Sequence, residues 1–226
     1  MKKFIAVIIL LLVLILFLIF LVYKMVTENG IIDVLRNEIV SQITPELEGE
    51  FIDKANNLTR AGNYREALKY YDAVIKTNPR NARAYYNRSA VKIRIRDYKG
   101  AVEDASASIE ISPSFYAYQN KIAANQRLKE WQSALDDINV YISNNWPNKE
   151  KFYYQKGRCL MKLKSYNEAV KVFDEYEQAV PQRYKASLYK NRAYCYGMLG
   201  DIEKSKTDYA KAKNLGSKKA EDILEN

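Results

Sequence analysis

Residues 51–79 read FIDKANNLTRAGNYREALKYYDAVIKTNP, and much of the remaining chain repeats the pattern of this stretch. Phe51 opens it, Gly62-Asn63-Tyr64 supplies a turn signal near the middle, Ala67 follows, and Pro79 closes it. Comparable stretches recur about every 34 residues toward the C-terminus, five in all. A fixed period of this length indicates stacked helical units, because a single unit cannot bury its apolar face alone.

The four later copies share an early aromatic residue, a central turn and a small residue in the second half, and most end in proline. They are marked by Tyr85, Asp97-Tyr98, Ala101 and Pro113; by Tyr118, Glu130-Trp131, Ala134 and Pro147; by Tyr153, Ser165-Tyr166, Ala169 and Pro181; and by Tyr189, Gly200-Asp201-Ile202 and Ser205. The pattern closely resembles the tetratricopeptide repeat, a helix-turn-helix unit. The resemblance implies an all-α fold, a right-handed α-solenoid of about five such units in residues 48–219. The units are residues 48–81, 82–114, 115–149, 150–185 and 186–219.

The fifth unit lacks the closing proline and has Gly216-Ser217 in its place. Ser217 is a favourable N-cap residue for one more helix. We therefore expect a C-terminal capping helix within residues 217–226, covering the last apolar face of the solenoid.

A run of twenty residues, Phe4 to Tyr23, contains no charged residue and no helix breaker. As a helix it would extend about 30 Å, the thickness of the hydrocarbon core of a bilayer. A cleaved signal peptide would have a shorter apolar region ending in a small-residue cleavage site. We therefore expect residues 1–24 to form a single-pass transmembrane anchor.

The charges that flank this run predict its orientation. Lys2 and Lys3 precede it and Lys24 follows it. The positive-inside bias places the N-terminus in the cytoplasm and the repeats on the far side, in the periplasm of a bacterium. A cytosolic repeat domain on an organelle surface is the alternative.

Residues 25–47 are expected to form a juxtamembrane stalk with a short amphipathic helix. Its apolar stripe consists of Ile32, Leu35, Ile39 and Ile43. Three roles remain open for this stripe: packing on the first repeat, lying on the membrane surface, and pairing with a second copy.

The chain carries 36 Lys and Arg against 27 Asp and Glu, a net charge of +9. Residues 1–47 are neutral overall, so the surplus belongs to the repeats. It is compatible with acidic partners or with an ordinary solvated surface, and nucleic acid is disfavoured because no dense basic run occurs.

Histidine is absent, so the commonest general base is missing, and we find no phosphate-binding or nucleophile motif. We therefore expect a protein that is not an enzyme, with no cofactor and no metal. Cys159 and Cys195 fall at equivalent places in consecutive units and are expected to be free, buried thiols.

The resemblance further implies that the first helix of each unit lines a concave groove that binds a protein or an extended peptide. The sixth position of each unit from the second to the fifth carries a carboxamide, which suits a passing peptide backbone. These residues are Asn87, Asn120, Gln155 and Asn191. The thirteenth position of each of the first four units carries a cation, which suits the carboxylates of an acidic segment. These residues are Arg60, Arg94, Arg127 and Lys162. Tyr154 and Arg158 complete the candidate groove. A generic surface and binding through the convex face are the alternatives.

Some members of this family grip acidic chaperone tails through a carboxylate clamp of two asparagines and three cations. Asn56 and Asn87 match two of its places, but Ile52, Tyr116 and Asn120 occupy those of the cations. The sequence therefore argues against a clamp of this kind.

The combined interpretation is a membrane-anchored scaffold or adaptor that mediates protein–protein interaction in a cell-envelope complex. Two alternatives remain. One is a structural subunit of a large envelope machine, such as a secretion system or a periplasmic flagellar collar, in which the chain could self-associate. The other is a holdase-like chaperone beside a translocon.

Overall fold

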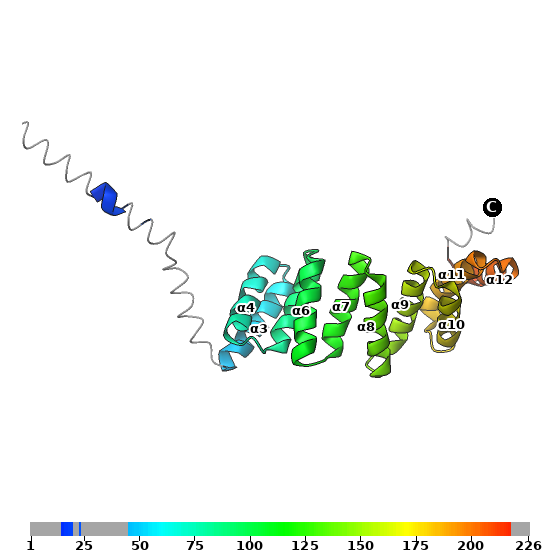
Figure 1. Cartoon of the computed structure of the whole chain (residues 1–226), viewed down its shortest axis with the longest axis horizontal. Coiled ribbons are helices and arrows are strands. Elements are labelled where there is room, and N and C mark those ends of the chain that lie inside the picture. Colours follow the sequence, from blue (N-terminus) through cyan, green and yellow to red (C-terminus); the bar gives the residue numbers. More distant parts are fainter. Residues whose placement is uncertain (1–14, 20–22, 24–44, 218–226) are drawn as a thin grey trace, which may run out of the picture.

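The computed structural model describes residues 15–19, 23 and 45–217. Ten helices lie in residues 45–217, and no strand occurs within the described ranges. The helices are α3 (Pro45–Arg60), α4 (Tyr64–Thr77), α5 (Ala82–Arg94), α6 (Tyr98–Ile111), α7 (Phe115–Leu128), α8 (Trp131–Ser143), α9 (Lys149–Lys162), α10 (Tyr166–Glu177), α11 (Gln182–Met198) and α12 (Ile202–Asn214) (Figure 1).

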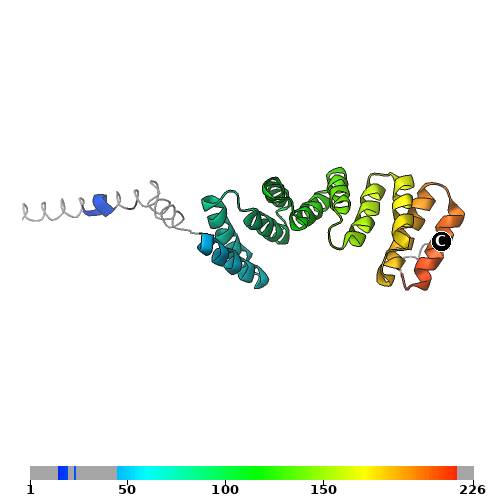
Figure 2. The same ribbon diagram turned by 90° about the horizontal axis from the view of Figure 1, so that it is seen from below.

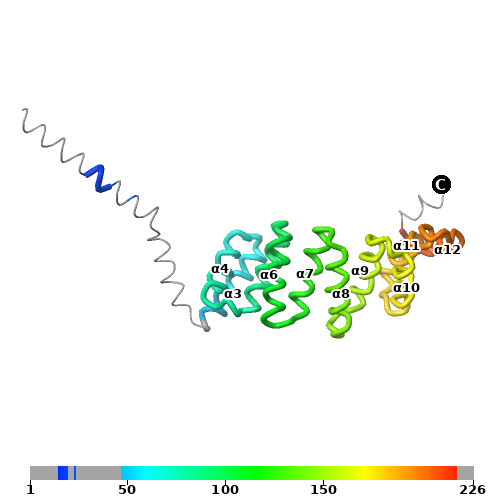
Figure 3. The backbone as a smooth tube through the Cα atoms, in the orientation of Figure 1, coloured from blue at the N-terminus to red at the C-terminus, as the bar shows by residue number. Residues whose placement is uncertain are grey.

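The ten helices form five consecutive antiparallel pairs arranged in a row. Each helix packs on the next one along the chain. Figures 1 and 2 show the row from two sides, and the tube in Figure 3 follows the same path from α3 to α12. The expectation of an all-α solenoid of helix-turn-helix units is thus confirmed.

The turn inside each pair uses one backbone device five times. One residue of each turn has positive φ: Gly62, Arg96, Lys129, Lys164 and Gly200. The next residue donates its N–H to the carbonyl five residues back, as from Asp97 to Lys92 at 2.9 Å. This is the Schellman closure of a helix end, which requires a left-handed residue just after the helix. Glycine adopts that conformation without steric cost, whereas arginine and lysine adopt it only at a steric cost.

Side-chain caps start several of the helices. Asn81, Ser114 and Asp201 each accept a hydrogen bond from the backbone N–H three residues ahead, and Asp97 does the same toward Gly100. These caps satisfy N–H groups that a helix leaves without intrahelical partners.

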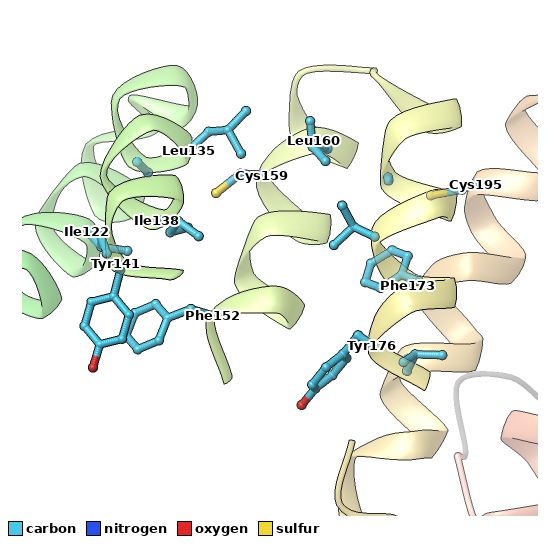
Figure 4. Close-up of a cluster of buried hydrophobic side chains, with 14 of the residues drawn as sticks. Ile122, Leu135, Ile138, Tyr141, Phe152, Cys159, Leu160, Phe173, Tyr176 and Cys195 are labelled. Carbon is cyan, nitrogen blue, oxygen red and sulfur yellow. The ribbon is translucent and has the colours of Figure 1, made fainter. Parts of the chain in front are cut away.

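The apolar core is divided along the row. One cluster lies in the first two pairs and includes Tyr71 and Val74. A larger cluster runs through the last three pairs and includes Ile138, Phe152 and Phe173 (Figure 4).

Between these clusters the contacts are small and polar. The Ser89 hydroxyl accepts a hydrogen bond from Asn120 at 2.7 Å, and the Ser108 hydroxyl donates to the Ala82 carbonyl at 2.9 Å. Small side chains here let α5 lie directly against α7.

Ion pairs with buried carboxylates tie the two helices of a unit together. Arg88 meets Asp104 at 2.6 Å, and Lys121 meets Asp137 at 3.0 Å. Arg192 meets Asp208 at 2.6 Å and also contacts α10. The two members of each pair occupy equivalent positions in the second, third and fifth units. Removing one member of a buried pair leaves the other charge uncompensated, which is strongly destabilising.

The first helix of the fifth pair begins earlier than the expected range. Helix α11 begins at Gln182, within the stretch assigned to the fourth unit, because Pro181 ends the preceding segment and directly precedes it. The first helix of this pair is therefore longer than those of its neighbours.

Three expectations concern residues that are largely or wholly undescribed. The stalk helix with Ile32, Leu35, Ile39 and Ile43 and the capping helix after Ser217 lie outside the described residues. Of the proposed anchor, residues 15–19 and 23 are described, and they are helical. Within the part of the chain that the structure describes, no helix is long and apolar enough to cross a membrane.

Candidate functional site

The first helices place the predicted cations at the solvent. Arg60, Arg94, Arg127, Arg158 and Lys162 are all exposed. Arg60 donates to the Asn57 side chain at 2.8 Å. The other four have no ion-pair partner among the described residues, so their charges are available to a ligand.

The predicted carboxamides are half-buried, and most are engaged within the protein. Asn120 donates to the Tyr86 carbonyl at 2.8 Å as well as to Ser89. Gln155 accepts from Gln126 at 3.1 Å, and the side-chain amide of Asn191 donates to the Tyr154 hydroxyl at 3.1 Å.

The hydrogen bonds of Asn120, Gln155 and Asn191 join neighbouring first helices. Asn87 has no side-chain hydrogen bond among the described residues, so it alone of the four carboxamides keeps both its donor and its acceptor free.

Two of the other residues at the clamp positions have partners within the protein. Asn56 accepts a hydrogen bond from the Tyr71 hydroxyl at 2.7 Å. Tyr116 stacks on Tyr86 with ring centroids 5.4 Å apart. An aromatic pair therefore stands where a clamp needs a cation.

One cavity on the first-helix surface lies beside α9. It has a volume of about 240 Å³ and is lined by Gln126 of α7, by Lys151, Tyr154, Gln155 and Arg158 of α9, by Tyr176 of α10, and by Tyr184 of α11. Three predicted residues, Tyr154, Gln155 and Arg158, thus meet in one place.

The aromatic walls of the cavity differ in burial. Tyr176 is 2% exposed, whereas Tyr184 is 43% exposed. Burial raises the pKa of Tyr176 to about 12, so its hydroxyl stays protonated and can act as a donor. Figure 4 shows Tyr176 at the edge of the apolar cluster with its hydroxyl pointing away from the other labelled side chains.

A second hollow of about 270 Å³ adjoins the cavity and shares Lys151, Tyr176 and Tyr184 with it. It adds Arg183 and one acidic residue, Glu150. A larger, shallow hollow of about 750 Å³ lies mainly on the second helix α4 and the turn before it, and Phe51 is its one lining residue from a first helix.

Sequence reasoning missed Gln126, Tyr176 and Tyr184 as lining residues. In α7, which contributes Gln126, Ile122 replaces the small residue found at the same position in the other first helices, namely Ala55, Ser89, Gly157 and Ala193. A larger side chain at such a packing position alters how the next unit stacks.

The thiols are free and buried, as expected for Cys159 and Cys195. Burial raises the pKa of both and brings that of Cys195 to about 12, which makes them poor nucleophiles. In the described residues, no group of three or more acidic or cysteine side chains could hold a metal ion.

Comparison with protein families finds matches to one repeat type in two parts of the chain. Residues 52–114 and residues 150–180 each match a family model described as tetratricopeptide repeat. These matches cover parts of the first, second and fourth helix pairs.

Known proteins with similar sequences or folds include three instructive cases. Hsp70-Hsp90 organizing protein 1 of Glycine max is 34% identical over 103 residues, which make up 41% of this chain and 18% of that protein. The chain therefore spans less than a fifth of that relative.

The crystal structure of MamA protein aligns with a TM-score of 0.70 at 20% identity, covering 79% of this chain and 96% of that one. YrrB, described as a TPR protein with an unusual peptide-binding site, aligns with a TM-score of 0.67 at 22% identity over 74% and 84% of the two chains. At these identities the structural likeness concerns the fold.

Proposed function

Because the chain contains tetratricopeptide repeats, we propose that it is a non-enzymatic scaffold that binds protein segments along the surface of its first helices. The observation that carries the proposal is the set of exposed cations at the thirteenth positions. Arg94, Arg127 and Lys162 stand on three consecutive first helices without an ion-pair partner among the described residues. Such a column can pair with carboxylates spaced along an extended segment.

The similar proteins support the same class of function. The name of Hsp70-Hsp90 organizing protein 1 describes a protein that organises two other proteins, and YrrB is described as having a peptide-binding site. Each likeness covers this chain or its relative only in part, so the particular partners of those proteins are not carried over.

The test is capture of partners by the full-length chain with its charge column reversed. Arg94→Glu combined with Arg127→Glu should abolish capture, because both exposed charges change sign while neither takes part in packing. Lys99→Glu combined with Lys171→Glu is the matched control, since both residues are exposed and lie on second helices. Unchanged capture by the first variant, with helicity intact, would refute binding at the first-helix surface.

The scaffold is proposed to be held at a membrane by residues 4–23 as a single-pass anchor. The support is the uncharged run of twenty apolar residues. The lysines at positions 2 and 3 favour a cytoplasmic N-terminus and repeats in the periplasm, within a cell-envelope complex.

Protease treatment of intact spheroplasts carrying a C-terminal tag tests this arrangement. Digestion of the tag without lysis supports the extracytoplasmic location, and protection until lysis reverses it.

A structural part of a larger envelope assembly is the second candidate, favoured by the extended row of helix pairs (Figure 2). Copy number separates the candidates. An assembly part co-purifies in a fixed, symmetric ratio, an adaptor substoichiometrically, and a holdase-like chaperone with many clients.

A further inference from the structure

The cavity beside α9 is a built pocket, because its walls are held by contacts across three first helices. Gln126 of α7 donates to Gln155 at 3.1 Å. Asn191 of α11 donates to the hydroxyl of Tyr154 at 3.1 Å, and the Arg158 guanidinium lies 5.9 Å from the Tyr154 ring centroid. The position of the Tyr154 ring is therefore set from both sides before any ligand arrives.

The charge of the cavity is positive. Lys151 and Arg158 are its only ionisable lining residues apart from tyrosines, and both are exposed. Neither has an ion-pair partner in the described part of the chain. The adjoining hollow contributes Arg183, and Glu150 offsets one of these charges.

The remaining walls combine apolar faces with hydrogen-bonding groups. Tyr154, Tyr176 and Tyr184 supply aromatic surface, and Gln126 and Gln155 supply amides. Tyr184 is 43% exposed, and its ring is covered on one side by the Arg183 guanidinium at 4.8 Å from the centroid. Such a site suits a side chain that is apolar itself and lies next to negative charge.

The size of the cavity limits what it can hold. It offers a volume of about 240 Å³. Ligand pockets for drug-sized molecules and cofactors begin at about 300 Å³. The cavity by itself therefore suits one large side chain of a bound segment.

We propose that this cavity is an anchor subsite for an acidic–hydrophobic segment of a partner protein, holding one aromatic or large aliphatic side chain between Tyr154 and Tyr184. Carboxylates next to that side chain pair with Lys151 and Arg158. The inference rests on the proposed scaffold function and names the chemistry of the segment that the scaffold selects. A segment without the apolar residue would leave the tyrosine rings exposed to water. A segment without the carboxylates would leave Lys151 and Arg158 without an ion-pair partner.

The experiment measures binding of three synthetic peptides of equal length to the full-length chain by fluorescence anisotropy. The first carries one phenylalanine flanked by glutamates, the second the same phenylalanine flanked by glutamines, and the third the glutamates with glycine in place of phenylalanine. We expect the first to bind at least about tenfold more tightly than either of the others, the equivalent of about 1.4 kcal/mol. Its advantage over the second should shrink as salt is raised, because the cations are exposed.

Two pairs of substitutions, each with one variant in the cavity and one control, locate the effect. Tyr184→Ala should weaken the first peptide about tenfold, whereas Tyr194→Ala should not, although both tyrosines lie on α11 with exposures of 43% and 44%. Arg158→Glu should weaken it at least as much, whereas Lys171→Glu on α10 should leave it unchanged. None of these four side chains is buried, so the variants are expected to fold.

Equal affinity for all three peptides, or equal effects of the cavity and control substitutions, would overturn the inference. Binding of none of the peptides would also overturn it. The scaffold proposal itself is judged separately, by capture of partners with the Arg94 and Arg127 variant. A single-stranded oligonucleotide that binds more tightly than the first peptide would assign the cations to nucleic acid and likewise refute the inference.

Discussion

Replacing Gly157 with alanine is expected to destabilise the fourth helix pair, although alanine is the better helix former. A Cβ atom at this position would lie 2.4 Å from Cε1 and 2.5 Å from Cζ of Phe173. Phe173 is fully buried, so its ring has no free space into which to move. Reaching an ordinary contact distance requires a displacement of about 1 Å in a close-packed core.

The magnitude follows from two opposing effects. Forcing a methyl group into a packed core costs about 1–3 kcal/mol, and the size of this overlap indicates the upper part of that range. The gain in helix propensity from glycine to alanine returns about 1 kcal/mol. The net loss is about 2 kcal/mol, which lowers the melting temperature by about 4–8 °C for a domain of this size.

The assay is far-UV circular dichroism during urea and thermal unfolding, with Gly197→Ala as the control. Gly197 is also within a first helix, but its added Cβ would lie 3.4 Å from the Ser205 hydroxyl, an ordinary contact. We expect that control to be neutral or up to about 1 kcal/mol more stable. If the two alanine variants were equally stable, the reasoning would be refuted.

A second variant separates the steric cause from a general effect on the helix. Phe173→Leu removes the ring edge that the new methyl group meets. Combined with Gly157→Ala, it should show a favourable coupling of at least about 1 kcal/mol in a double-mutant cycle. Additive effects would count against the proposed overlap.

Three further outcomes are expected. Arg96→Gly should stabilise the chain by up to about 1 kcal/mol in urea unfolding, because Arg96 is left-handed, whereas Gly200→Ala should destabilise it by about 1–2 kcal/mol. Burial acts to raise the pKa of Glu177, but the hydrogen bond from Arg192 prevails and lowers it below the ordinary 4.5. The ionised Glu177 side chain therefore stabilises the fold above about pH 4.5, and this contribution is lost as the pH falls through the folded-state pKa. Glu177→Gln should thus flatten the acid limb of a stability–pH curve. An unchanged acid limb would contradict this. The two buried thiols should react with a thiol reagent only at the urea concentrations that unfold the chain, and fast labelling of the native protein would show that the helix pairs open locally.

The repeat period, the five helix pairs and the residues that each first helix presents could all be predicted from the amino-acid sequence. These features follow from local rules. Helical spacing assigns a face, the turn of each unit terminates a helix, and residues such as Ala67 and Ala134 recur where helices cross. Arg94, Arg127 and Lys162 could therefore be placed at the surface without a structure.

Which of those residues are free to act depends on how the helices pack. Asn120, Gln155 and Asn191 share the pattern of Asn87, yet their side chains bond to neighbouring helices. The partners are as much as 37 residues away in the chain, as for Asn191 and Tyr154. No local pattern encodes such a distance.

The cavity beside α9 depends on the same kind of information. Its walls come from α7, α9, α10 and α11, and its volume is what remains after those helices have packed. The repeat pattern specifies the neighbours of each helix, but the residual space between them depends on side-chain volumes at individual contacts.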